Sequence, residues 1–496
     1  MTRKLRIVFF VTLFAGIAAF GAKPNVIFIL TDDLGFGDVG WTWKSVAARK
    51  VDAARGECRI QTPNLDRLAE EGVVMNSHYC AAPVCAPSRA SILTGVKQRK
   101  CSVHDNMFDH PITEPETLAT VMKRAGYRTM AIGKWGVGGG GESGKPVSAH
   151  PLDKGFDSYY GFMDHLAGHT YYHYDGYLNH AYMGLWNGRV KATEDGVGVY
   201  STDLFIARAK REISAAVEEN RGKPFFLYLA VNTVHGSGRN DASIKNTHPL
   251  HVPGRAYPKG GVEWPLEKEN LAERNTWIDP RYRYPVDGRQ QKPGSRAMTE
   301  NMQRYATAVS RLDDAIGDLM RHLEKLGVID ETIVIFTSDN GPAAEYGADP
   351  RAFASTGPFD GFKRDVYEGG VRVPTFVWRK GGFAVKEDAE PSIAYDWMPT
   401  LADFAGVAAP KQCDGVSLKP RLEGRRGEKS KIEIEYRGFP QTGVAAYDEF
   451  AVRKGYAVRG EEKMRREGDV VTLEAGGKPP RRYDVVKDPH QDSPLD

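Results

Sequence analysis

The chain has little net charge, few cysteines and, beyond Phe20, no long apolar run. Its 67 Lys and Arg against 64 Asp and Glu give a net charge of +3, too small to favour nucleic acid or an anionic membrane as a partner. No later stretch is apolar enough for a bilayer span of about 20 residues. Repeats and low-complexity tracts are also absent from the sequence. With 41% hydrophobic and 26% charged residues, the composition is that of an ordinary globular protein.

The first residues are typical of a secretory signal peptide. Arg3, Lys4 and Arg6 precede the apolar run Ile7–Phe20, and small residues follow it. A positively charged start, a short apolar core and small residues mark a segment that signal peptidase removes. We therefore predict that residues 1–22 are removed and that the protein is exported to a bacterial periplasm or secreted. An uncleaved anchor is the alternative, but the run is short for a span of about 20 residues, so no stable membrane anchor is expected.

Two apolar segments that end in acidic side chains indicate the fold. Val26–Leu30 leads into Thr31-Asp32-Asp33, and Thr332–Phe336 leads into Ser338-Asp339-Asn340. Continuous apolar runs of this length suit central parallel strands that are covered on both faces. Ligands of such sheets gather beyond the carboxyl ends of the strands. We therefore expect both acidic clusters at the same edge of one sheet.

Helical patterns alternate with strand patterns through most of the chain. The pattern Thr113-Glu114-Pro115-Glu116 is a capping box and predicts a helix that reaches about Ala125. The other elements expected in this part are helices at 203–219 and 300–326 and strands at 129–132 and 225–229. This alternation predicts an α/β fold with a mostly parallel central sheet covered by helices.

The pattern changes near Lys431, where short segments and polar turns predict a small antiparallel sheet. The expected strands lie at 431–436, 450–453, 455–459, 470–473 and 482–486. We expect three parts: a signal peptide at 1–22, a catalytic domain at 23–425 and an antiparallel C-terminal subdomain at 426–496. Within the catalytic domain, Gly236–Ser295 is rich in Pro, Gly and charge, which predicts an irregular insertion.

The segment Pro83–Gly95 carries the strongest chemical signal. It places Cys85 four residues before Arg89, where a helix is about to begin. A helix N-terminus beside a fixed cation favours an anion. Taken alone, Cys85 also fits a buried inert thiol or half of a disulfide. The remaining cysteines leave room for no disulfide, one or two, without specifying the pairing: Cys58, Cys80, Cys101 and Cys413.

The acidic clusters are candidate metal ligands. Asp32, Asp33, Asp339 and Asn340 offer only oxygen atoms, which Ca²⁺ and Mg²⁺ prefer. A single Asp pair after a strand is more often a helix cap or a solvated loop than a metal site. Two such clusters at one edge, together with the Cys85 segment, favour a metal site.

The pattern Cys-x-Pro-x-Arg at Cys85–Arg89 resembles the signature of the type I sulfatases. Five further segments match that family in order and span nearly the whole mature chain: 23–35, 132–135, 336–341, 363–374 and 483–489. The resemblance implies an alkaline-phosphatase-like α/β fold. It also implies that Cys85 is oxidised to formylglycine by a formylglycine-generating enzyme or an anaerobic sulfatase-maturating enzyme.

The resemblance further implies a role for each site residue. One Ca²⁺ ion would be held by five ligands: Asp32, Asp33, Cys85, Asp339 and Asn340. Arg89 and Lys134 would hold the hydrated aldehyde, Lys363 would bind the sulfate, and His235 would contact the sulfate and protonate the leaving oxygen. One hydroxyl of the hydrate attacks sulfur and displaces the alcohol, and the other, once deprotonated, expels sulfate and restores the aldehyde. If they did not lie in matched segments, Lys134 and Lys363 would be interpreted as ordinary solvated lysines.

Gly136 departs from the family pattern. Many sulfatases have a histidine two residues after the motif lysine, and it is often assigned as the base in sulfate release. Some carbohydrate sulfatases share the Gly-Lys-Trp-Gly sequence that this chain has. Four histidines are candidates to replace the missing one, although each also fits a structural or substrate-facing role: His104, His150, His165 and His169.

These features predict an exported sulfatase that hydrolyses sulfate esters of a polysaccharide or oligosaccharide. The tract Tyr159–Tyr182 is dense in Tyr and His, and it fits either stacking on sugar rings or a loop packed by its own aromatics. A phosphoester or phosphonate hydrolase of the same superfamily is one alternative, which two metal ions would favour. A non-catalytic sulfated-glycan-binding protein is the other, and Gly136 is the feature that points to it.

Overall fold

The computed structural model describes residues 23–42, 60–106, 110–140, 147–163, 165, 167–172, 184–219, 222–236, 252–270, 272–274, 276–283, 300–344, 349–437, 445–455, 461–475 and 477–495. The predicted signal peptide at 1–22 and Cys58 lie outside these residues.

A ten-stranded sheet forms the centre of the molecule. β1 (Asn25–Thr31) pairs in parallel with β8 (Phe225–Ala230) on one side and with β9 (Thr332–Ser338) on the other. The sheet order is β11-β2-β10-β9-β1-β8-β4-β5-β6-β7. The remaining strands are β2 (Val73–Met75), β4 (Arg128–Lys134), β5 (Ser158–Phe162), β6 (Leu185–Asn187), β7 (Val190–Lys191), β10 (Phe376–Trp378) and β11 (Glu387–Asp388). Parallel pairing from β9 to β5 is flanked by antiparallel strands at both sides, so the predicted mostly parallel α/β sheet is confirmed.

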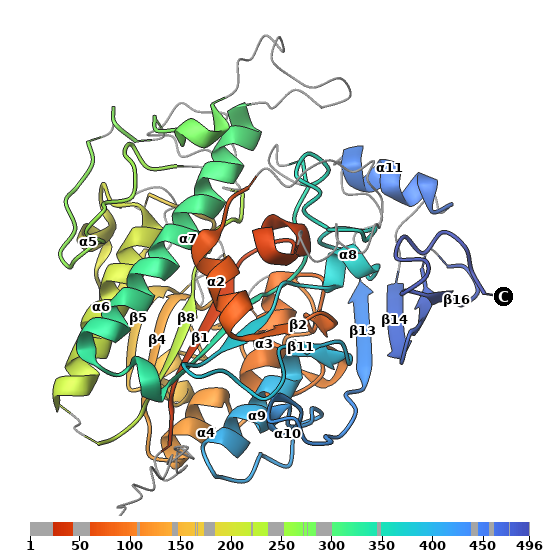
Figure 1. The fold of residues 1–496 in the computed structure, drawn as a ribbon, viewed down its shortest axis with the longest axis horizontal. Helices are drawn as coiled ribbons and strands as arrows, with labels where there is room; N and C mark the ends of the chain where they lie inside the picture. Colours follow the sequence, from red (N-terminus) through yellow and green to blue (C-terminus); the bar gives the residue numbers. More distant parts are fainter. Residues whose placement is uncertain are drawn as a thin grey trace, which may run out of the picture.

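Helices cover both faces of this sheet because its central strands are apolar on both sides. In β1, Phe28 packs into one core and Ile29 into the other. The first core includes α3 (Cys85–Thr94), α4 (Leu118–Arg124) and α9 (Trp397–Phe404), and the second includes α2 (Pro63–Glu71), α6 (Ser201–Glu219) and α7 (Glu300–Leu326). Figure 1 shows α6 and α7 side by side along the sheet. Helix α7 has the bounds that its helical periodicity predicts, and Gly327 follows it with a φ of 70°.

A second, antiparallel sheet near the C-terminus has the order β13-β14-β15-β16 and lies at the right of Figure 1. Its strands are β13 (Ile432–Arg437), β14 (Glu461–Glu467), β15 (Val470–Glu474) and β16 (Arg481–Asp484). The prediction of an antiparallel C-terminal sheet is therefore confirmed. Apolar residues of this sheet, such as Ile434 and Met464, belong to the same core as α3 and α9. The boundary at 425 and 426 stays a prediction.

Two details of the C-terminal prediction are wrong. Residues 450–453 belong to a helix, α11 (Ala445–Arg453), in which Phe450 packs against Phe362 and Tyr367. The sequence analysis missed β14 because its segment, Glu-Glu-Lys-Met-Arg-Arg-Glu, is almost entirely charged. Its alternate side chains are nevertheless buried. Hydrogen bonds from distant residues, such as that from the Val366 amide to Glu462, reduce the free-energy cost of burying these polar groups. The expected strand at 455–459 falls mostly outside the described residues.

Helix α4 begins later than its sequence pattern predicts. Thr117, not Thr113, is its N-cap, and the Thr117 side chain accepts a hydrogen bond from the Thr120 amide. Glu114 is used elsewhere, because its carboxylate accepts hydrogen bonds from the amide and the hydroxyl of Ser102. A capping box does form, but between Thr117 and Thr120, four residues later than predicted. The hydrogen bonds between Ser102 and Glu114 hold the predicted cap segment outside the helix.

Shorter elements complete the described chain. They are β3 (His78–Tyr79), β12 (Ser392–Ile393), α5 (Thr193–Gly196), α8 (Glu368–Val371), α10 (Lys419–Leu422), η1 (Phe36–Asp38), η3 (Gln98–Lys100), η5 (Pro151–Lys154), η6 (Ala167–His169), η7 (Pro280–Tyr282), η8 (Ile329–Glu331) and η9 (Ala394–Asp396). In the described parts of the predicted insertion Gly236–Ser295, η7 is the one regular element, in line with an irregular segment.

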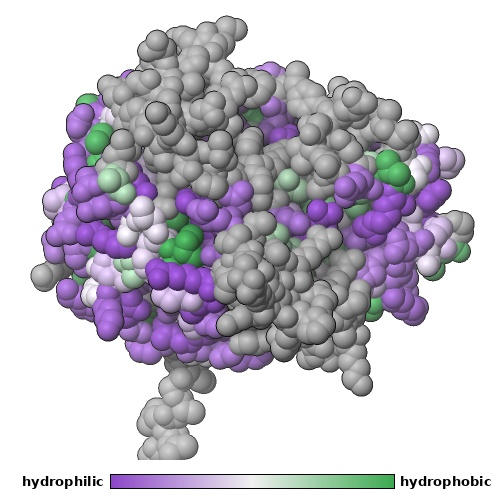
Figure 2. Space-filling model, turned by 90° about the horizontal axis from the view of Figure 1, so that it is seen from above, coloured by the Kyte–Doolittle hydropathy of each residue, from purple (hydrophilic) through white to green (hydrophobic). Residues whose placement is uncertain are grey.

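The four described cysteines are free thiols: Cys80, Cys85, Cys101 and Cys413. Within the described residues, no helix combines the length and the apolar character that a bilayer span requires. Figure 2 shows the molecule from above, and the coloured residues on that face are mainly hydrophilic, with hydrophobic ones in small separate groups.

His78 makes the stability of the fold pH-dependent. Burial, followed by the charge of Arg421, lowers the pKa of His78 to about 3, whereas an unfolded histidine has a pKa of about 6.5. Between these values the unfolded chain binds the proton and the folded chain does not. The free energy of unfolding is therefore expected to fall as pH drops through this window, by at most about 5 kcal/mol from this group.

Denaturant titrations of wild type and His78→Gln across the same window test this expectation. Glutamine does not titrate, and it retains polar atoms near the Ser392 hydroxyl, which lies 2.8 Å from His78 Nδ1. The variant should show a shallower loss of stability on acidification. Parallel pH profiles for the two proteins would show that the expectation is wrong.

Candidate active site

The acidic clusters lie together at the carboxyl edge of the central sheet. β1 and β9 are adjacent parallel strands in which Thr31 pairs with Ser338, so the residues that follow the two strands are neighbours. Asp33 N donates to Asp339 Oδ1 at 3.1 Å, and Asn340 Nδ2 donates to Asp33 Oδ1 at 2.7 Å. All four predicted oxygen ligands are buried. Their meeting point is the one that parallel-strand topology predicts.

Cys85 is the first residue of α3, and Arg89 lies one turn later on the same face. Arg89 donates from Nε to Asp339 Oδ2 at 2.9 Å, and its NH2 lies 2.8 Å from the same oxygen. The spacing of four residues therefore places a thiol and a guanidinium beside the same carboxylates. Both side chains are buried, so these ionic contacts are formed away from water.

Lys134 adds a second cation from the end of β4. Its Nζ donates to Asp32 Oδ2 at 2.7 Å, and Arg89 NH1 donates to the Lys134 carbonyl at 3.2 Å. Burial raises the pKa of Asp32, but the charges of Lys134 and Arg89 outweigh it and hold that pKa well below its usual range. Burial, followed by the charge of Asp32, raises the pKa of Asp339 well above its usual range. A divalent cation among these oxygens would offset that repulsion.

Lys363 and His235 form a pair beside Asp33. Lys363 Nζ lies 2.8 Å from Asp33 Oδ1 and 3.1 Å from His235 Nε2. Burial, followed by the charge of Lys363, lowers the pKa of His235 well below its usual range. The neutral ring therefore accepts a hydrogen bond from the lysine through Nε2. Asp33 has a φ of 62°, a conformation that few residues other than glycine adopt and that is often found at functional sites.

The donor set fits a hard divalent cation. Asp32, Cys85 and Asp339 each offer a ligand atom within 4.8 Å of the others, and so do Asp32, Asp33 and His235. Buried Asp32 Oδ1 and Asn340 Oδ1 have no hydrogen-bond partner among the described residues, as expected of oxygens that face an ion. Because both groups share Asp32, they outline one candidate metal site among the described residues.

Two of the four candidate histidines, His165 and His169, contact predicted site residues, whereas His150 and His104 have other surroundings. His165 Nε2 lies 3.6 Å from Cys85 Sγ, and the His169 ring stacks on that of His235 with 3.8 Å between centroids. His150 is structural, because its Nδ1 accepts from the Leu152 amide and its Nε2 lies 3.2 Å from the Gly188 carbonyl oxygen.

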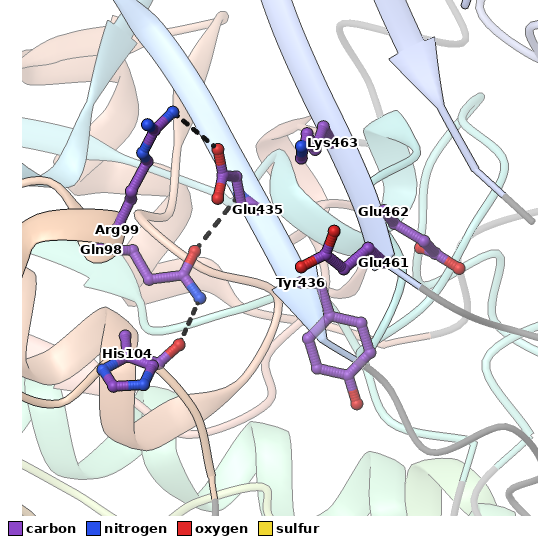
Figure 3. Close-up of a pocket in the computed structure, with 8 residues that line it drawn as sticks. All are labelled: Gln98, Arg99, His104, Glu435, Tyr436, Glu461, Glu462 and Lys463. Carbon is purple, nitrogen blue, oxygen red and sulfur yellow. Dashed lines mark hydrogen bonds and ion pairs between the residues drawn. The ribbon is translucent and has the colours of Figure 1, made fainter. Parts of the chain in front are cut away.

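His104 lies in a separate pocket of about 270 Å³ between η3 and the C-terminal sheet (Figure 3). The pocket is lined by Gln98, Arg99, His104, Glu435, Tyr436, Glu461, Glu462 and Lys463. Three glutamates against one arginine and one lysine make it a poor site for an anionic sulfate. Glu435 is also engaged already, because its amide donates to Gln98 Oε1 at 3.2 Å and its carboxylate pairs with Arg99.

Sequence reasoning missed Asn106. Its Oδ1 accepts from the Ala86 amide at 3.1 Å, and its Nδ2 lies 3.7 Å from Cys85 Sγ. No sequence pattern marks this residue, because it reaches the site from an irregular segment. In the aromatic tract, Tyr171 and Tyr172 pack with Tyr200 in a small buried cluster, which fits the self-packing interpretation for the described part. Residues 173–182 of the tract lie outside the described residues.

Comparison with known proteins identifies the family. The sequence model of the sulfatase family matches residues 24–407. The chain belongs to the sulfatase family. Sulfatases hydrolyse sulfate esters, so the buried cations and carboxylates described above belong to an enzyme of that class. The match includes every predicted site residue from Asp32 to Lys363.

Individual sulfatases are similar over most of the chain. N-acetylgalactosamine-6-sulfatase of Rattus norvegicus is 28% identical over 424 residues, which cover 82% of this chain and 67% of the relative. Steryl-sulfatase of Homo sapiens is 26% identical over 552 residues, which cover 99% of this chain and 88% of the relative. These two relatives carry names of different substrates, so membership of the sulfatase family does not by itself define a substrate.

Solved structures of similar proteins have the same fold. The crystal structure of Ps i-CgsB has a TM-score of 0.68 and 25% identity, covering 95% of this chain and 88% of that one. The same protein in complex with k-i-k-neocarrahexaose has a TM-score of 0.66. A phosphonate monoester hydrolase of Agrobacterium radiobacter has a TM-score of 0.52 at 20% identity, covering 95% of this chain and 91% of that one, which shows the shared fold alone.

Proposed function

We propose that this sulfatase hydrolyses sulfate esters of a carbohydrate, using formylglycine made from Cys85 and one Ca²⁺ ion. The observation that carries the proposal is the placement of Cys85 within 4.8 Å of ligand oxygens of Asp32 and Asp339, beside Arg89. The hydrated aldehyde would supply a hydroxyl nucleophile, and the ion would polarise the sulfate oxygens. A formylglycine-generating or anaerobic sulfatase-maturating enzyme is the implied partner, and export through residues 1–22 stays a prediction.

The charges of the site suit an anionic substrate. Three buried carboxylates, of Asp32, Asp33 and Asp339, face three buried cations, of Arg89, Lys134 and Lys363. These charges balance, so a bound divalent ion leaves the site with an excess of two positive charges. A buried site with that excess attracts a sulfate ester and stabilises the charge that develops as the ester bond breaks.

The residues around the ligand oxygens have distinct tasks in this proposal. Arg89 and Lys134 are held by Asp339 and Asp32 and orient the oxygens at position 85. The Lys363 ammonium, hydrogen-bonded to neutral His235, binds the sulfate. His235 would protonate the departing alcohol oxygen, with the Lys363 ammonium, 3.1 Å from Nε2, as the neighbouring source of that proton.

Similar proteins support a carbohydrate substrate. One is solved in complex with k-i-k-neocarrahexaose, and another sulfatase relative is named for N-acetylgalactosamine 6-sulfate. The two candidate ligand groups share Asp32 and outline one metal site among the described residues, which disfavours the alternative of a two-metal phosphoester or phosphonate hydrolase. Retention of the complete set of buried cations disfavours a protein that only binds sulfated glycans.

A substrate panel tests the proposal. Matured enzyme is assayed for sulfate release from sulfated mono- and oligosaccharides, a steryl sulfate and para-nitrophenyl sulfate, and for turnover of a phosphonate monoester. We expect kcat/KM to be highest for a sulfated saccharide. Turnover of the aryl or steryl ester without any sulfated saccharide would contradict the carbohydrate assignment, and preference for the phosphonate would favour the alternative hydrolase.

A further inference from the structure

The side chain of His165 lies directly against the residue that carries the nucleophile. His165 follows β5, is buried, and places Nε2 3.6 Å from Cys85 Sγ. Two backbone hydrogen bonds fix its segment to the end of β4: Trp135 N donates to the Phe162 carbonyl at 2.9 Å, and Gly136 N donates to the Met163 carbonyl at 3.4 Å. These bonds place the end of the strand that carries Lys134 beside the end of β5, which His165 follows.

Position 136 lies next to this ring. A Cβ atom at Gly136 would lie 3.6 Å from His165 Nδ1 and 3.7 Å from Lys134 Cε, which are ordinary van der Waals contacts. Gly136 also has a φ of 67°, which glycine adopts without the cost that other residues incur. Position 136 and the His165 ring are thus direct neighbours at the site.

The other described histidines near the site have different contacts. His169 stacks on His235 and meets His165 edge-on, with ring centroids 4.9 Å apart. His235 is paired with Lys363 beside Asp33. Within the described part of the chain, His165 is the histidine that contacts Cys85, while His235 is the one that contacts the lysine proposed to bind sulfate.

We propose that His165 is a catalytic residue that accepts a proton at position 85 during sulfate release, which deepens the proposed function and rests on it. After the alcohol has left, residue 85 would carry a sulfate group, bonded through oxygen, and a hydroxyl on the same carbon. The hydroxyl proton would move to His165 Nε2, and the electron pair of the O–H bond would form the second C=O bond. The C–O bond to sulfate would break, and its electron pair would leave with the sulfate. His165 would then pass its proton to water, addition of water to the aldehyde would restore the hydrate, and no oxidant or reductant is consumed.

The test uses the matured, calcium-loaded enzyme with para-nitrophenyl sulfate as the probe. The variants are His165→Ala and His165→Gln, the second of which fills the same space without accepting the proton. His322→Gln is the control, because His322 bonds Ser214 and the Lys210 carbonyl at the interface of α6 and α7, outside the site. Intact mass first establishes that residue 85 is oxidised to the same extent in every protein.

We expect both His165 variants to release about one phenol per enzyme in a rapid burst and then to turn over roughly 10²- to 10⁴-fold more slowly than wild type. The peptide that contains residue 85 should gain the mass of one sulfate when the slow phase is quenched, a readout that does not depend on turnover. The control should show neither effect.

Two results would overturn the inference. One is a turnover rate in both His165 variants that matches wild type. The other is slow turnover without a burst and without a sulfated peptide, because His165 would then act before sulfate release. Failure of the wild type to hydrolyse any sulfate ester in the panel would instead count against the proposed function.

Discussion

Replacement of Cys85 by alanine is expected to abolish sulfate ester hydrolysis while leaving the fold and the sulfate-binding cations in place. Loss of a covalent nucleophile costs roughly 10⁴- to 10⁶-fold in rate, because the other groups at the site then act on water alone. Arg89, Lys134 and Lys363 retain their carboxylate partners in this variant, since none of those contacts involves the sulfur. Substrate should therefore still bind. Initial rates and calorimetric binding of the best saccharide measure the two effects separately.

Cys101→Ala is the matched control for this prediction. Cys101 is buried and free like Cys85, but its sulfur lies beside the Thr94 hydroxyl at the other end of α3. That variant should lose some stability through its cavity and keep its rate. If Cys85→Ala retained a rate comparable to wild type, the nucleophile assignment would be wrong.

Removal of calcium is expected to have the second largest effect. Asp32 and Asp339 still repel each other beside Arg89 and Lys134, which contributes to the raised pKa of Asp339, so chelation of the ion should lower both the rate and the melting temperature. Ca²⁺ at about 100 times its Kd would contribute about 2.7 kcal/mol to stability. Loss of several kcal/mol of charge stabilisation in the transition state corresponds to roughly 10²- to 10³-fold in rate.

The variant Asp32→Asn tests whether calcium stabilises the protein by binding at this site rather than elsewhere. The substitution keeps the shape of the side chain but removes the charge that Lys134 and Arg89 approach. The melting temperature of this variant should no longer rise with calcium, whereas that of Asp330→Asn should rise as in wild type. Asp330 is an exposed acid whose described partner is Lys380. A chelated wild-type enzyme with an unchanged rate and melting temperature would contradict the metal site.

The parts of the fold that sequence predicts well are those in which local pattern and tertiary packing agree. β1 and β9 are continuous apolar runs, and α7 has an apolar face of helical period over its whole length. The acidic clusters could be placed together because parallel strands end at the same edge. The matched segments then identified Lys134 and Lys363, whose charges alone would not distinguish them from ordinary surface residues. His235 was assigned by resemblance from its position after a strand, outside those segments.

The parts that sequence predicts poorly depend on partners that are distant in the chain. β14 is almost fully charged and forms a strand because β13 and β15 flank it. The start of α4 is displaced because Ser102 engages Glu114. His165 and Asn106 reach Cys85 from irregular segments, 80 and 21 residues away in sequence, so no periodicity or spacing relates them to it. The sequence named His165 as one of four candidate histidines and did not indicate Asn106, so the structure was needed to identify both as contacts of Cys85.

The most direct test of the account is the mass of the peptide that contains Cys85, taken from active enzyme made in its native host. The account predicts an aldehyde or its hydrate at this position, in an amount that matches the active fraction of the enzyme. Full sulfatase activity in a preparation whose Cys85 is entirely an unmodified thiol would contradict it.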